Sequence, residues 1–310
     1  MPRREPLVVS VPTRQLADAL APAPDGVEII VWPMDAAAPR AAIDLVVPPY
    51  MSMHEALPWL DGVRTSLVQS QSIGYEGVAE LLPAGHRFAN AGSVHETSTA
   101  ELAVGLTIAV QRGIDAFAVD SREGVWAPRF TASLADRRVL LLGYGGVGKA
   151  VAVRLAPFEV ELTVVAHRAR DEDGVVVHGV DDLPALLPNA DIVILTLPGG
   201  DATRHLIDDA ALAALPDGAL VVNVGRGPLI DTDALVAHAR RGRIRAALDV
   251  TDPEPLPQGH ALWNTPGVLI SPHVGGASSA MGPRMLRLLR AQIDRLHRGE
   301  EPVNVVIDTR

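Results

Sequence analysis

The stretch Arg138-Val-Leu-Leu-Leu-Gly-Tyr-Gly-Gly-Val-Gly-Lys149 joins a short apolar run to the glycine spacing G-x-G-x-x-G. The apolar run predicts a buried strand, and Lys149–Leu155 predicts a helix directly after the glycines. In such a unit the first glycine permits the tight turn, and the second lets the backbone approach a pyrophosphate. The third lets the helix pack closely on the strand, and the helix N-terminus then faces the phosphate charge. The stretch therefore predicts a dinucleotide-binding unit; the alternative is a tight turn without a ligand.

Further apolar segments of strand length follow this unit and alternate with helical patterns. They are Leu162–Ala166, Asp191–Leu197, Ala219–Val224, Ala246–Val250 and Val268–Ser271. Six successive strands, of which the first leads into a glycine-rich turn, are typical of a Rossmann domain. Small and apolar residues at helical spacing over Glu96–Gln111 predict the first helix of this domain, which any of Thr97, Ser98 and Thr99 can cap.

An earlier series of strands predicts a second, smaller α/β domain. The strands are Leu7–Val11, Val27–Val31, Asp44–Val47, Ser66–Gln69 and Phe88–Ala91, with helical patterns at Arg14–Ala21 and Ala56–Leu60. Ser278–Arg298 repeats apolar residues at helical spacing and is free to return to this domain. We therefore expect an α/β protein of two Rossmann-like or flavodoxin-like domains, each with a doubly wound parallel sheet, and a cleft between them. The expected boundaries are 1–95 plus 277–310 for a discontinuous substrate domain and 96–276 for the dinucleotide-binding domain.

The composition narrows the classes of function. The chain of 310 residues has no cysteine and a net charge of −10, which excludes disulfides and thiolate metal sites and disfavours a nucleic-acid surface. Its ten histidines are scattered, and no H-x-x-x-H spacing with an added carboxylate indicates a metal site. No apolar run reaches the roughly 18 residues of a membrane span, and Met1–Pro6 contains no hydrophobic signal-peptide segment. We expect a soluble, cytoplasmic protein without nucleic-acid or membrane partners.

The residues after the second strand of the Rossmann domain bear on the choice of cofactor. An NAD enzyme usually places Asp or Glu there, about 20 residues beyond the glycines, to bind the ribose 2′-hydroxyl. In this chain His167 and Arg168 follow Ala166, Arg170 comes close behind, and Asp171 arrives only after this basic cluster. An arginine can pair bidentately with a 2′-phosphate that a carboxylate would repel. The pattern favours NADP over NAD; the alternative is a solvated loop with incidental arginines.

Polar residues after three later strands predict a site that reduces a keto acid. This reaction needs a cation that holds the carboxylate and polarises the carbonyl, and a group of near-neutral pKa that protonates the forming alkoxide. It also benefits from a carboxylate that orients this group and raises its pKa. Arg226, His273 and Glu254 supply these roles in that order. Taken singly, each residue has an alternative interpretation. Arg226 can be a surface arginine, His273 a structural histidine, and Glu254 a solvated charge in a loop.

With these segments the sequence resembles the D-isomer-specific 2-hydroxyacid dehydrogenases, a family that includes glyoxylate/hydroxypyruvate reductases and phosphoglycerate dehydrogenases. The resemblance covers nearly the whole chain and is strongest over residues 95–280. Gln71-Ser-Ile-Gly-Tyr-Glu76 is similar to the family's substrate-carboxylate loop, and Ser98-Thr-Ala-Glu-Leu102 is similar to the start of its interdomain helix. Leu197–Ile207 is similar to the loop beneath its cofactor, whereas Thr251 stands where many relatives have an aromatic residue.

The resemblance implies an NAD(P)-dependent oxidoreductase that moves a hydride between the cofactor and a 2-keto or D-2-hydroxy acid. It implies that Arg226 binds the substrate carboxylate and carbonyl, that His273 is the acid/base, and that Glu254 is its partner. The amides of Ser72, Ile73 and Gly74 would bind the carboxylate, and Asp249 would bind the nicotinamide carboxamide. The expected cofactor contacts are Gly143, Tyr144, Gly145, Gly146, Val147, Gly148, His167, Arg168, Leu197, Pro198, Thr203, Val224, Gly225, Asp249 and Gly275.

The substrate and the partners are less sharply indicated. Tyr50 and Met51, with Met53 beside them, either form an apolar, adaptable substrate pocket or pack beneath their loop. No basic cluster stands there, which disfavours a phosphorylated substrate such as phosphoglycerate. Glu96–Gln111 resembles the helix through which relatives form twofold dimers, so we expect a homodimer with this helix buried at the interface. The alternatives are a formate or phosphite dehydrogenase of the same fold, or a non-catalytic NAD(H)-sensing protein similar to the family's co-repressors.

Overall fold

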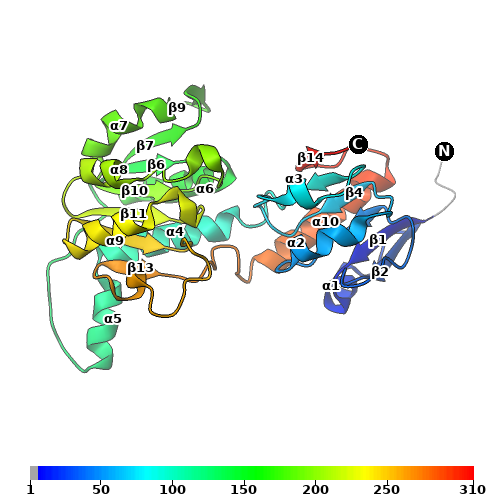
Figure 1. The fold of residues 1–310 in the computed structure, drawn as a ribbon, viewed down its shortest axis with the longest axis horizontal. Helices are drawn as coiled ribbons and strands as arrows, with labels where there is room; N and C mark the ends of the chain where they lie inside the picture. Colours follow the sequence, from blue (N-terminus) through cyan, green and yellow to red (C-terminus); the bar gives the residue numbers. More distant parts are fainter. Residues whose placement is uncertain (1–5) are drawn as a thin grey trace. The chain divides into compact units, whose positions relative to one another are not determined.

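The computed structural model describes residues 6–310, which divide into two compact units (Figure 1). The first unit comprises the chain up to His95 together with Ser279–Arg310, and the second comprises Glu96–Ser278. The expectation that the chain starts without a signal-peptide segment rests largely on residues 1–5, which lie outside the described residues. Both units combine a mainly parallel sheet with helices, so the α/β class predicted from the sequence is confirmed.

The first unit is built on a six-stranded sheet in the order β14-β5-β4-β3-β1-β2. Its strands are β1 (Leu7–Val11), β2 (Val27–Val31), β3 (Leu45–Val46), β4 (Leu67–Gln69), β5 (Arg87–Ala89) and β14 (Val305–Asp308). All pairs are parallel except β14 with β5, which is antiparallel at the edge. Since β1 lies between β2 and β3, the order is that of a flavodoxin-like sheet.

Helices cover both faces of this sheet. They are α1 (Arg14–Leu20), α2 (Met53–Ala56), the 3₁₀ helix η1 (Leu57–Leu60), α3 (Val78–Leu81) and α10 (Met281–His297). One face packs against α1 and α10, and the other packs against α2, η1 and α3. Because both faces are covered, β1 is buried along its whole length and reads as a continuous apolar run. On α10, the buried Gln292 amide donates to Gln69 of β4 at 2.7 Å and to the carbonyl of Val303 at 2.8 Å.

The second unit is built on an eight-stranded sheet in the order β13-β12-β11-β10-β6-β7-β9-β8. Its strands are β6 (Arg138–Leu142), β7 (Glu161–Ala166), β8 (Arg170–Glu172), β9 (Val175–Gly179), β10 (Ile192–Leu195), β11 (Ala219–Asn223), β12 (Ile244–Leu248) and β13 (Val268–Ile270). All run parallel except β8, which is antiparallel to β9. β6 lies between β10 and β7, which is the topological switch point where open α/β sheets bind ligands.

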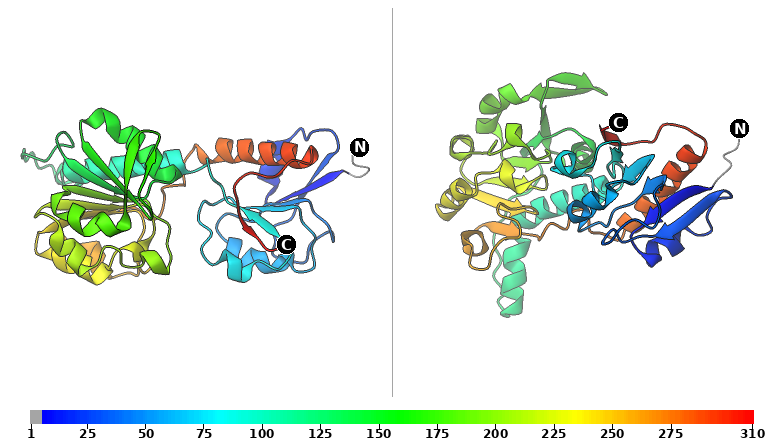
Figure 2. Two further views of the ribbon diagram at one scale, coloured as in Figure 1. Left: turned by 90° about the horizontal axis from the view of Figure 1, so that it is seen from above. Right: turned by 45° about the vertical axis from the view of Figure 1, so that its right-hand side comes forward.

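Two layers of helices enclose this sheet, as the left panel of Figure 2 shows. The helices are α4 (Glu96–Gln111), α5 (Ile114–Arg122), α6 (Gly146–Leu155), α7 (Leu183–Leu186), α8 (Asp209–Ala214) and α9 (Thr232–Arg240). The 3₁₀ helices are η2 (Ala156–Phe158), η3 (Val180–Asp182), η4 (Leu187–Asn189), η5 (Asp201–Thr203), η6 (Gly227–Leu229) and η7 (Ala261–Asn264). α4 and α6 pack on one face, and α7, α8 and α9 pack on the other.

Three strands differ from the prediction. No strand was predicted between β7 and β10, but this part of the chain forms β8 and β9. In β9 the side chain of Val177 is buried while its neighbour Val176 is exposed, so the strand is half-buried and not a continuous buried run. β14 was likewise not predicted, because its residues are at most partly buried. All three strands are short and at most partly buried, and β8 and β14 lie at sheet edges, so they lack the continuous buried pattern that indicated the central strands.

α5 stands apart from the rest of the second unit. Figure 1 and the right panel of Figure 2 show it extending away from the sheet, followed by a long connection to β6. The helix has no buried residue. In the connection, Trp126 and Phe130 are almost fully exposed, with relative exposures of 94% and 109%. Within residues 6–310 no single helix is long and apolar enough to cross a membrane, and α4 with α5, bent by 66°, passes that test only as a pair.

Candidate active site

The glycine-rich turn follows β6 as the sequence predicts. Gly143 has a φ of 103°, and a Cβ there would lie 2.7 Å from Oγ1 of Thr196. A Cβ on the buried Gly148 would lie 2.1 Å from the carbonyl oxygen of Gly143, which is far inside van der Waals contact. The first glycine is thus required by backbone conformation, and the third is required by the close packing of α6 on the turn.

Gly145 differs from both, because the protein itself does not require a glycine there. Its φ of −86° and ψ of −162° suit any residue, and a Cβ would have no heavy atom within 4 Å. This residue directly precedes α6, so its bare backbone lies at the N-terminus of a ten-residue helix. A helix N-terminus with accessible amides is suited to an anion such as a pyrophosphate. The residues present therefore fit a dinucleotide at the switch point beside β6.

Basic side chains near the end of β7 divide into two groups. Arg170 lies on β8 and donates from Nε to Glu172 at 2.8 Å, and Lys149 pairs with the same carboxylate. The Lys149 ammonium also lies 5.7 Å from the centre of the Tyr144 ring. His167 and Arg168 are exposed, and in the described part of the chain their side chains have no ion-pair partner. Of the arginines in this cluster, Arg168 is therefore the one whose charge is not compensated by Glu172.

The loops after β10 and β11 pack against each other beside the glycine turn. Thr196 donates from Oγ1 to the carbonyls of Leu142 and Gly143, at 3.2 Å and 3.1 Å. A Cβ on Gly225 would lie 2.6 Å from the carbonyl oxygen of Leu197, so this approach also needs a glycine. In the loop after β10, Thr203 donates to the carbonyl of Pro198 at 3.0 Å. The loop residues expected to contact the cofactor thus have defined positions at the carboxyl ends of neighbouring strands.

Arg226 lies in a turn that a buried asparagine holds in place. β11 ends at Asn223, whose amide donates to the carbonyl of Arg226 at 2.9 Å and accepts from the amide of Gly225 at 3.0 Å. The Arg226 guanidinium donates to the carbonyl of Gly225 at 2.7 Å. Asn223 was not assigned a role from the sequence. Its only sequence signal is a polar residue at the end of an otherwise apolar strand.

His273 and Glu254 contact each other, although they come from different loops. Oε1 of Glu254 lies against Nδ1 of His273, and the two side chains are 39% and 49% exposed. With Nδ1 engaged, Nε2 is the ring nitrogen that remains for a substrate. Glu254 follows β12, and His273 follows β13, the next strand in the sheet. Neighbouring parallel strands therefore bring the two residues together at one edge.

The charges at this site favour a protonated imidazole beside an ionised carboxylate. The hydrogen bond to Glu254 raises the pKa of His273 above its ordinary value, and the Glu254 and Asp249 charges act in the same direction. Burial and the Arg226 charge oppose this rise. Burial acts to raise the pKa of Glu254, but the hydrogen bond and charge of His273 outweigh it, so this pKa is lowered. The charge of Arg226 acts to lower the pKa of both groups, so all three expected catalytic residues interact electrostatically.

Asp249 directly follows β12 and is buried, with a relative exposure of 2%. Its carboxylate accepts from the hydroxyl of Ser271 at 2.6 Å and from the amides of Val274 and Gly275 at 2.9 Å and 2.8 Å. Three hydrogen bonds thus bind this side chain to the segment that carries His273. Neither these contacts nor the role of Ser271 was predicted from the sequence.

In the first unit, the loop expected to bind a carboxylate has two available amides rather than three. The Ser72 amide already donates to Oγ of Ser70 at 2.9 Å. Across residues 6–310 no acceptor contacts the amides of Ile73 and Gly74. Asn90 donates to the carbonyl of Ile73 at 3.0 Å and so fixes the loop. The arrangement leaves two successive N–H groups for an anion.

The apolar residues after β3 differ in how far their side chains are buried. Tyr50 is half-buried and stacks on His95, with ring centres 5.9 Å apart. Met51 is 88% exposed, whereas Met53 is buried and accepts a hydrogen bond from Ser70 at 3.2 Å. Met53 therefore packs beneath the loop, and Tyr50 and Met51 remain the candidates for substrate contact.

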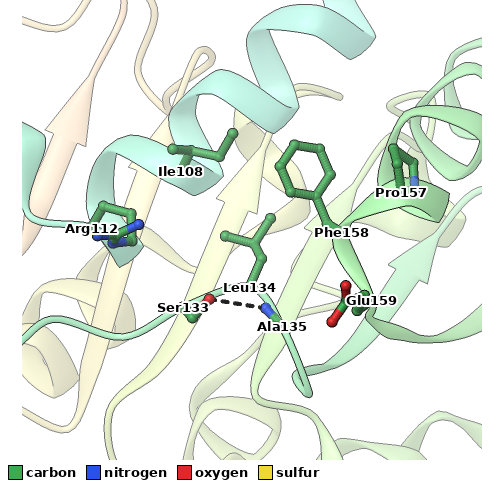
Figure 3. Close-up of a pocket in the computed structure, with 8 residues that line it drawn as sticks. All are labelled: Ile108, Arg112, Ser133, Leu134, Ala135, Pro157, Phe158 and Glu159. Atoms are coloured by element: carbon green, nitrogen blue, oxygen red, sulfur yellow. Dashed lines mark hydrogen bonds between the residues drawn. The ribbon is translucent and has the colours of Figure 1, made fainter.

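A hollow elsewhere in the second unit involves none of the residues expected at the site. Its volume is about 260 Å³, and it lies near the C-terminal end of α4 and η2, where Figure 3 shows its lining. The lining residues are Ile108, Arg112, Ser133, Leu134, Ala135, Pro157, Phe158 and Glu159.

The portion of the chain that the structure describes holds no group of three or more His, Asp or Glu side chains suited to a metal ion.

Comparisons with known proteins identify relatives over most of the chain. Residues 104–275 match the family described as "D-isomer specific 2-hydroxyacid dehydrogenase, NAD binding domain". The chain is 32% identical over 251 residues to a glyoxylate reductase of Thermofilum pendens, covering 77% of this chain and 74% of that protein. It is 30% identical over 225 residues to a hydroxypyruvate reductase of Thermotoga maritima, covering 70% and 73%. Among solved structures, a D-isomer specific 2-hydroxyacid dehydrogenase from Xanthobacter autotrophicus, in complex with NADPH and MES, has a TM-score of 0.79 at 27% identity, covering 97% and 98%.

Proposed function

Because this chain belongs to the D-isomer specific 2-hydroxyacid dehydrogenase family, we propose that it reduces a small 2-keto acid to the D-2-hydroxy acid with NADPH or NADH. The contact between His273 and Glu254, with Arg226 close enough to act on both, is the observation that carries the proposal. The names of the relatives, glyoxylate reductase and hydroxypyruvate reductase, favour a small keto acid. The nicotinamide supplies a hydride to the carbonyl carbon when it is bound.

Arg226, His273 and Glu254 have the other roles in the proposed reaction. Arg226 binds the substrate carboxylate and polarises the carbonyl, because its planar guanidinium matches both oxygens. The imidazolium of His273 gives its Nε2 proton to the carbonyl oxygen as negative charge develops there. Glu254 stabilises the imidazolium and fixes the ring by its contact with Nδ1. In the reverse direction, the neutral imidazole accepts the proton of the hydroxy acid.

The first unit supplies a second set of substrate contacts in this proposal. The amides of Ile73 and Gly74 bind the carboxylate, which their lack of an acceptor within residues 6–310 supports. The Ser72 amide is left out of this role, because it donates to Ser70. Tyr50 and the exposed Met51 line the substituent on the keto acid. An apolar, adaptable lining suits a range of small substituents better than a phosphate.

The basic residues after β7 support NADP as the preferred cofactor. Glu172 compensates the charges of Arg170 and Lys149, which leaves His167 and Arg168 to meet a 2′-phosphate. Asp171 lies on β8 beyond this pair rather than at the end of β7. The NADPH in the Xanthobacter autotrophicus structure agrees with this choice without deciding it for this chain.

We also propose that the protein forms a homodimer through the second unit. α5 and the connection after it expose Ile114, Val119, Val125, Trp126 and Phe130. A contiguous group of exposed large apolar side chains on one protruding element is typical of a protein–protein contact. Twofold symmetry is the commonest arrangement for such self-association.

A spectrophotometric screen of cofactor oxidation tests the proposed reaction. Glyoxylate, hydroxypyruvate, pyruvate and an aromatic keto acid are each offered with NADPH and with NADH. Formate and phosphite are offered with NADP and NAD in the opposite direction, since a dehydrogenase of the same fold for either anion is the main competing activity. Turnover of a keto acid supports the proposal. Turnover of formate or phosphite alone, or binding of cofactor without any turnover, would overturn it.

A further inference from the structure

His95 is a buried histidine to which the proposed reaction gives no role. It is 5% exposed and is the last residue of the first unit, directly before α4. Its Nε2 atom lies 2.7 Å from the carbonyl oxygen of Gln71. Because a carbonyl oxygen only accepts, Nε2 carries a hydrogen and donates it. The imidazole therefore binds the backbone of the loop after β4, just before the two amides proposed to bind the substrate carboxylate.

Three successive carbonyls of this loop, those of residues 71–73, accept hydrogen bonds from the first unit. The donors are, in that order, the His95 imidazole, the backbone amide of Ala91 and the Asn90 side chain, at 2.7 Å, 2.8 Å and 3.0 Å. In a planar trans peptide the N–H group points away from the C=O group. The amides of Ile73 and Gly74, which share peptide units with the second and third carbonyls, therefore face away from these donors. His95 fixes the peptide unit with which this run begins.

The same imidazole also contacts the loop after β3. It stacks on the ring of Tyr50, with ring centres 5.9 Å apart and ring planes inclined by 18°. Tyr50 is half-buried, so the stack restrains a ring that solvent only partly surrounds. In the proposed function Tyr50 lines the substituent of the keto acid. His95 thus contacts both substrate-binding loops, one through Nε2 and the other through the face of its ring.

The two loops contact each other directly as well. The Gln71 side chain donates to the carbonyl of Pro48 at 2.8 Å. At the other end of the loops, Nε2 of His54 donates to the carbonyl of Glu76 at 2.9 Å. All of these residues belong to the first unit. The loops are therefore joined at both ends, and His95 is the buried side chain that contacts each of them.

We propose that His95 is a positioning residue that fixes the Tyr50 ring relative to the amides of Ile73 and Gly74, and thereby determines which keto-acid substituents the site accepts. The inference rests on the proposed function, in which these amides bind the carboxylate. The carboxylate and the substituent of a 2-keto acid are attached to the same carbonyl carbon. A substrate that contacts both loops must therefore fit the spacing that the imidazole maintains. Substrate binding, and not proton transfer at His273, is the step that depends on His95.

The test uses two substitutions of His95 that each keep one of its contacts. His95→Phe keeps a ring that can stack on Tyr50 but cannot donate to Gln71, and His95→Gln keeps a donor without the ring. The control is His86→Phe, which changes another buried histidine of the first unit. His86 lies 2.7 Å from the Thr65 hydroxyl, at the amino ends of β4 and β5 and so at the opposite edge of the sheet from the two loops. We measure Tm, and kcat and KM for glyoxylate, pyruvate and phenylpyruvate at saturating NADPH.

His95→Phe should raise KM for all three keto acids by about 3- to 10-fold, the effect of one lost hydrogen bond, with kcat nearly unchanged. His95→Gln should leave KM for glyoxylate near the wild-type value. It should change the ratio of kcat/KM for phenylpyruvate and glyoxylate by about 3- to 10-fold, because the Tyr50 ring is no longer held. His86→Phe can lower Tm but should leave the KM values and the ratio unchanged.

Three results would overturn the proposal. The first is wild-type KM values and a wild-type ratio in both His95 variants. The second is a fall in kcat without a change in KM, since His95 would then act in the chemical step. The third is the same kinetic changes in His86→Phe, because they would then reflect a general loss of stability.

NMR of the tyrosine rings provides a readout that needs no substrate. The chain has three tyrosines, and the Tyr50 signal is the one that Tyr50→Leu lacks. This signal should move in His95→Gln and also in Gln71→Met, which removes the donor to Pro48, but not in His86→Phe. Gln71→Met keeps the proposal testable if the His95 variants do not fold, and an unmoved Tyr50 signal there would contradict it. If the wild type reduces no keto acid, the proposed function fails, while the tyrosine signals still decide whether the two loops are held together.

Discussion

The Nδ1 atom of His273 lies against Oε1 of Glu254, and this contact joins a loop after β12 to a loop after β13. The hydrogen bond raises the pKa of His273 above its ordinary value. In the proposed reaction the protonated imidazole gives its proton to the substrate, so we expect activity to fall as the pH rises through this pKa. If His273 has this role, the contact should extend the pH range of keto-acid reduction toward higher pH.

Removing the charge of Glu254 should shift the pH profile of keto-acid reduction to lower pH. Glu254→Gln takes away the carboxylate that raises the pKa of His273, so the alkaline limb of kcat/KM for keto-acid reduction should move to lower pH. The measurement is a pH–rate profile under conditions where chemistry limits the rate. Glu300→Gln, which alters an exposed carboxylate paired with Arg298 on the first unit, serves as the control. A profile for Glu254→Gln that overlays the wild type would count against the pairing.

Arg226 should be needed for the chemical step. Arg226→Ala removes the cation that polarises the carbonyl, and the loss of one such electrostatic group commonly costs about 10²- to 10³-fold in kcat. Arg226→Lys should rescue poorly, because an ammonium cannot reproduce the planar fork. Steady-state kinetics with the best keto acid measure both. If Arg226→Ala retained the kcat/KM of the wild type, Arg226 would have no role in substrate binding.

Cofactor preference should depend on Arg168 and much less on Arg170. A charge-assisted hydrogen bond from Arg168 to the 2′-phosphate is worth about 1.5–3 kcal/mol, or roughly a ten- to hundredfold preference for NADPH. Arg168→Asp should weaken NADPH strongly and leave NADH unchanged or improved. Arg170→Ala is the matched control, because Glu172 already compensates that guanidinium. The ratio of kcat/KM for the two cofactors decides the point, and a wild-type preference for NADH would mean that Arg168 only faces solvent.

Substitutions of two glycines in the turn should affect cofactor binding and protein stability separately. Gly145→Ala introduces a Cβ into open space at an ordinary φ, so Tm should not fall, but the affinity for NADPH should drop because the methyl group stands where the pyrophosphate approaches. Gly148→Ala forces a Cβ to within 2.1 Å of the Gly143 carbonyl and should destabilise the second unit. Overpacking of this kind costs about 1–3 kcal/mol. Thermal unfolding and fluorescence titration measure the two effects, and undiminished NADPH binding by Gly145→Ala would refute the pyrophosphate assignment.

Self-association should depend on the exposed aromatic residues after α5. The wild type should be a dimer by light scattering at micromolar concentration. The double variant Trp126→Ser with Phe130→Ser should shift it toward monomer, because both side chains are almost fully exposed in the single chain. Val153→Ser changes an apolar side chain on α6 that is 72% exposed and should leave the dimer intact. A monomeric wild type would refute the proposed homodimer.

The central elements could be predicted because burial left a clear pattern in the sequence. β1 and β2 coincide with their predicted segments, and α4 spans the predicted Glu96–Gln111. β8, β9 and β14 were missed because these strands are short and only partly buried. α5 was missed for a related reason, since a helix without buried residues need not follow a core-facing periodicity.

In the candidate site, too, the sequence pattern indicated some residues, whereas their contacts depend on the register of the sheet. Arg226, Glu254 and His273 were predicted as catalytic residues because each is a reactive side chain after a strand, at the edge where such sheets bind ligands. The hydrogen bonds of Asp249 could not be predicted, because they depend on how β12 and β13 align. The Ser72 amide was assigned to the substrate because no spacing rule reveals that the Ser70 hydroxyl already accepts from it.

The antiparallel pairing of β14 with β5 also bears on how the chain acquires its structure during synthesis. Phe88 of β5 pairs with Ile307 of β14, and Gln69 of β4 accepts from Gln292 of α10, so this sheet joins segments separated by more than two hundred residues. The second unit is one continuous segment, Glu96–Ser278, and has all its strands once that segment has left the ribosome. The first unit starts earlier but is completed later. We therefore expect residues 6–95 to emerge with one sheet face covered only by α1 and one sheet edge unpaired, and to remain so until α10 and β14 have been translated.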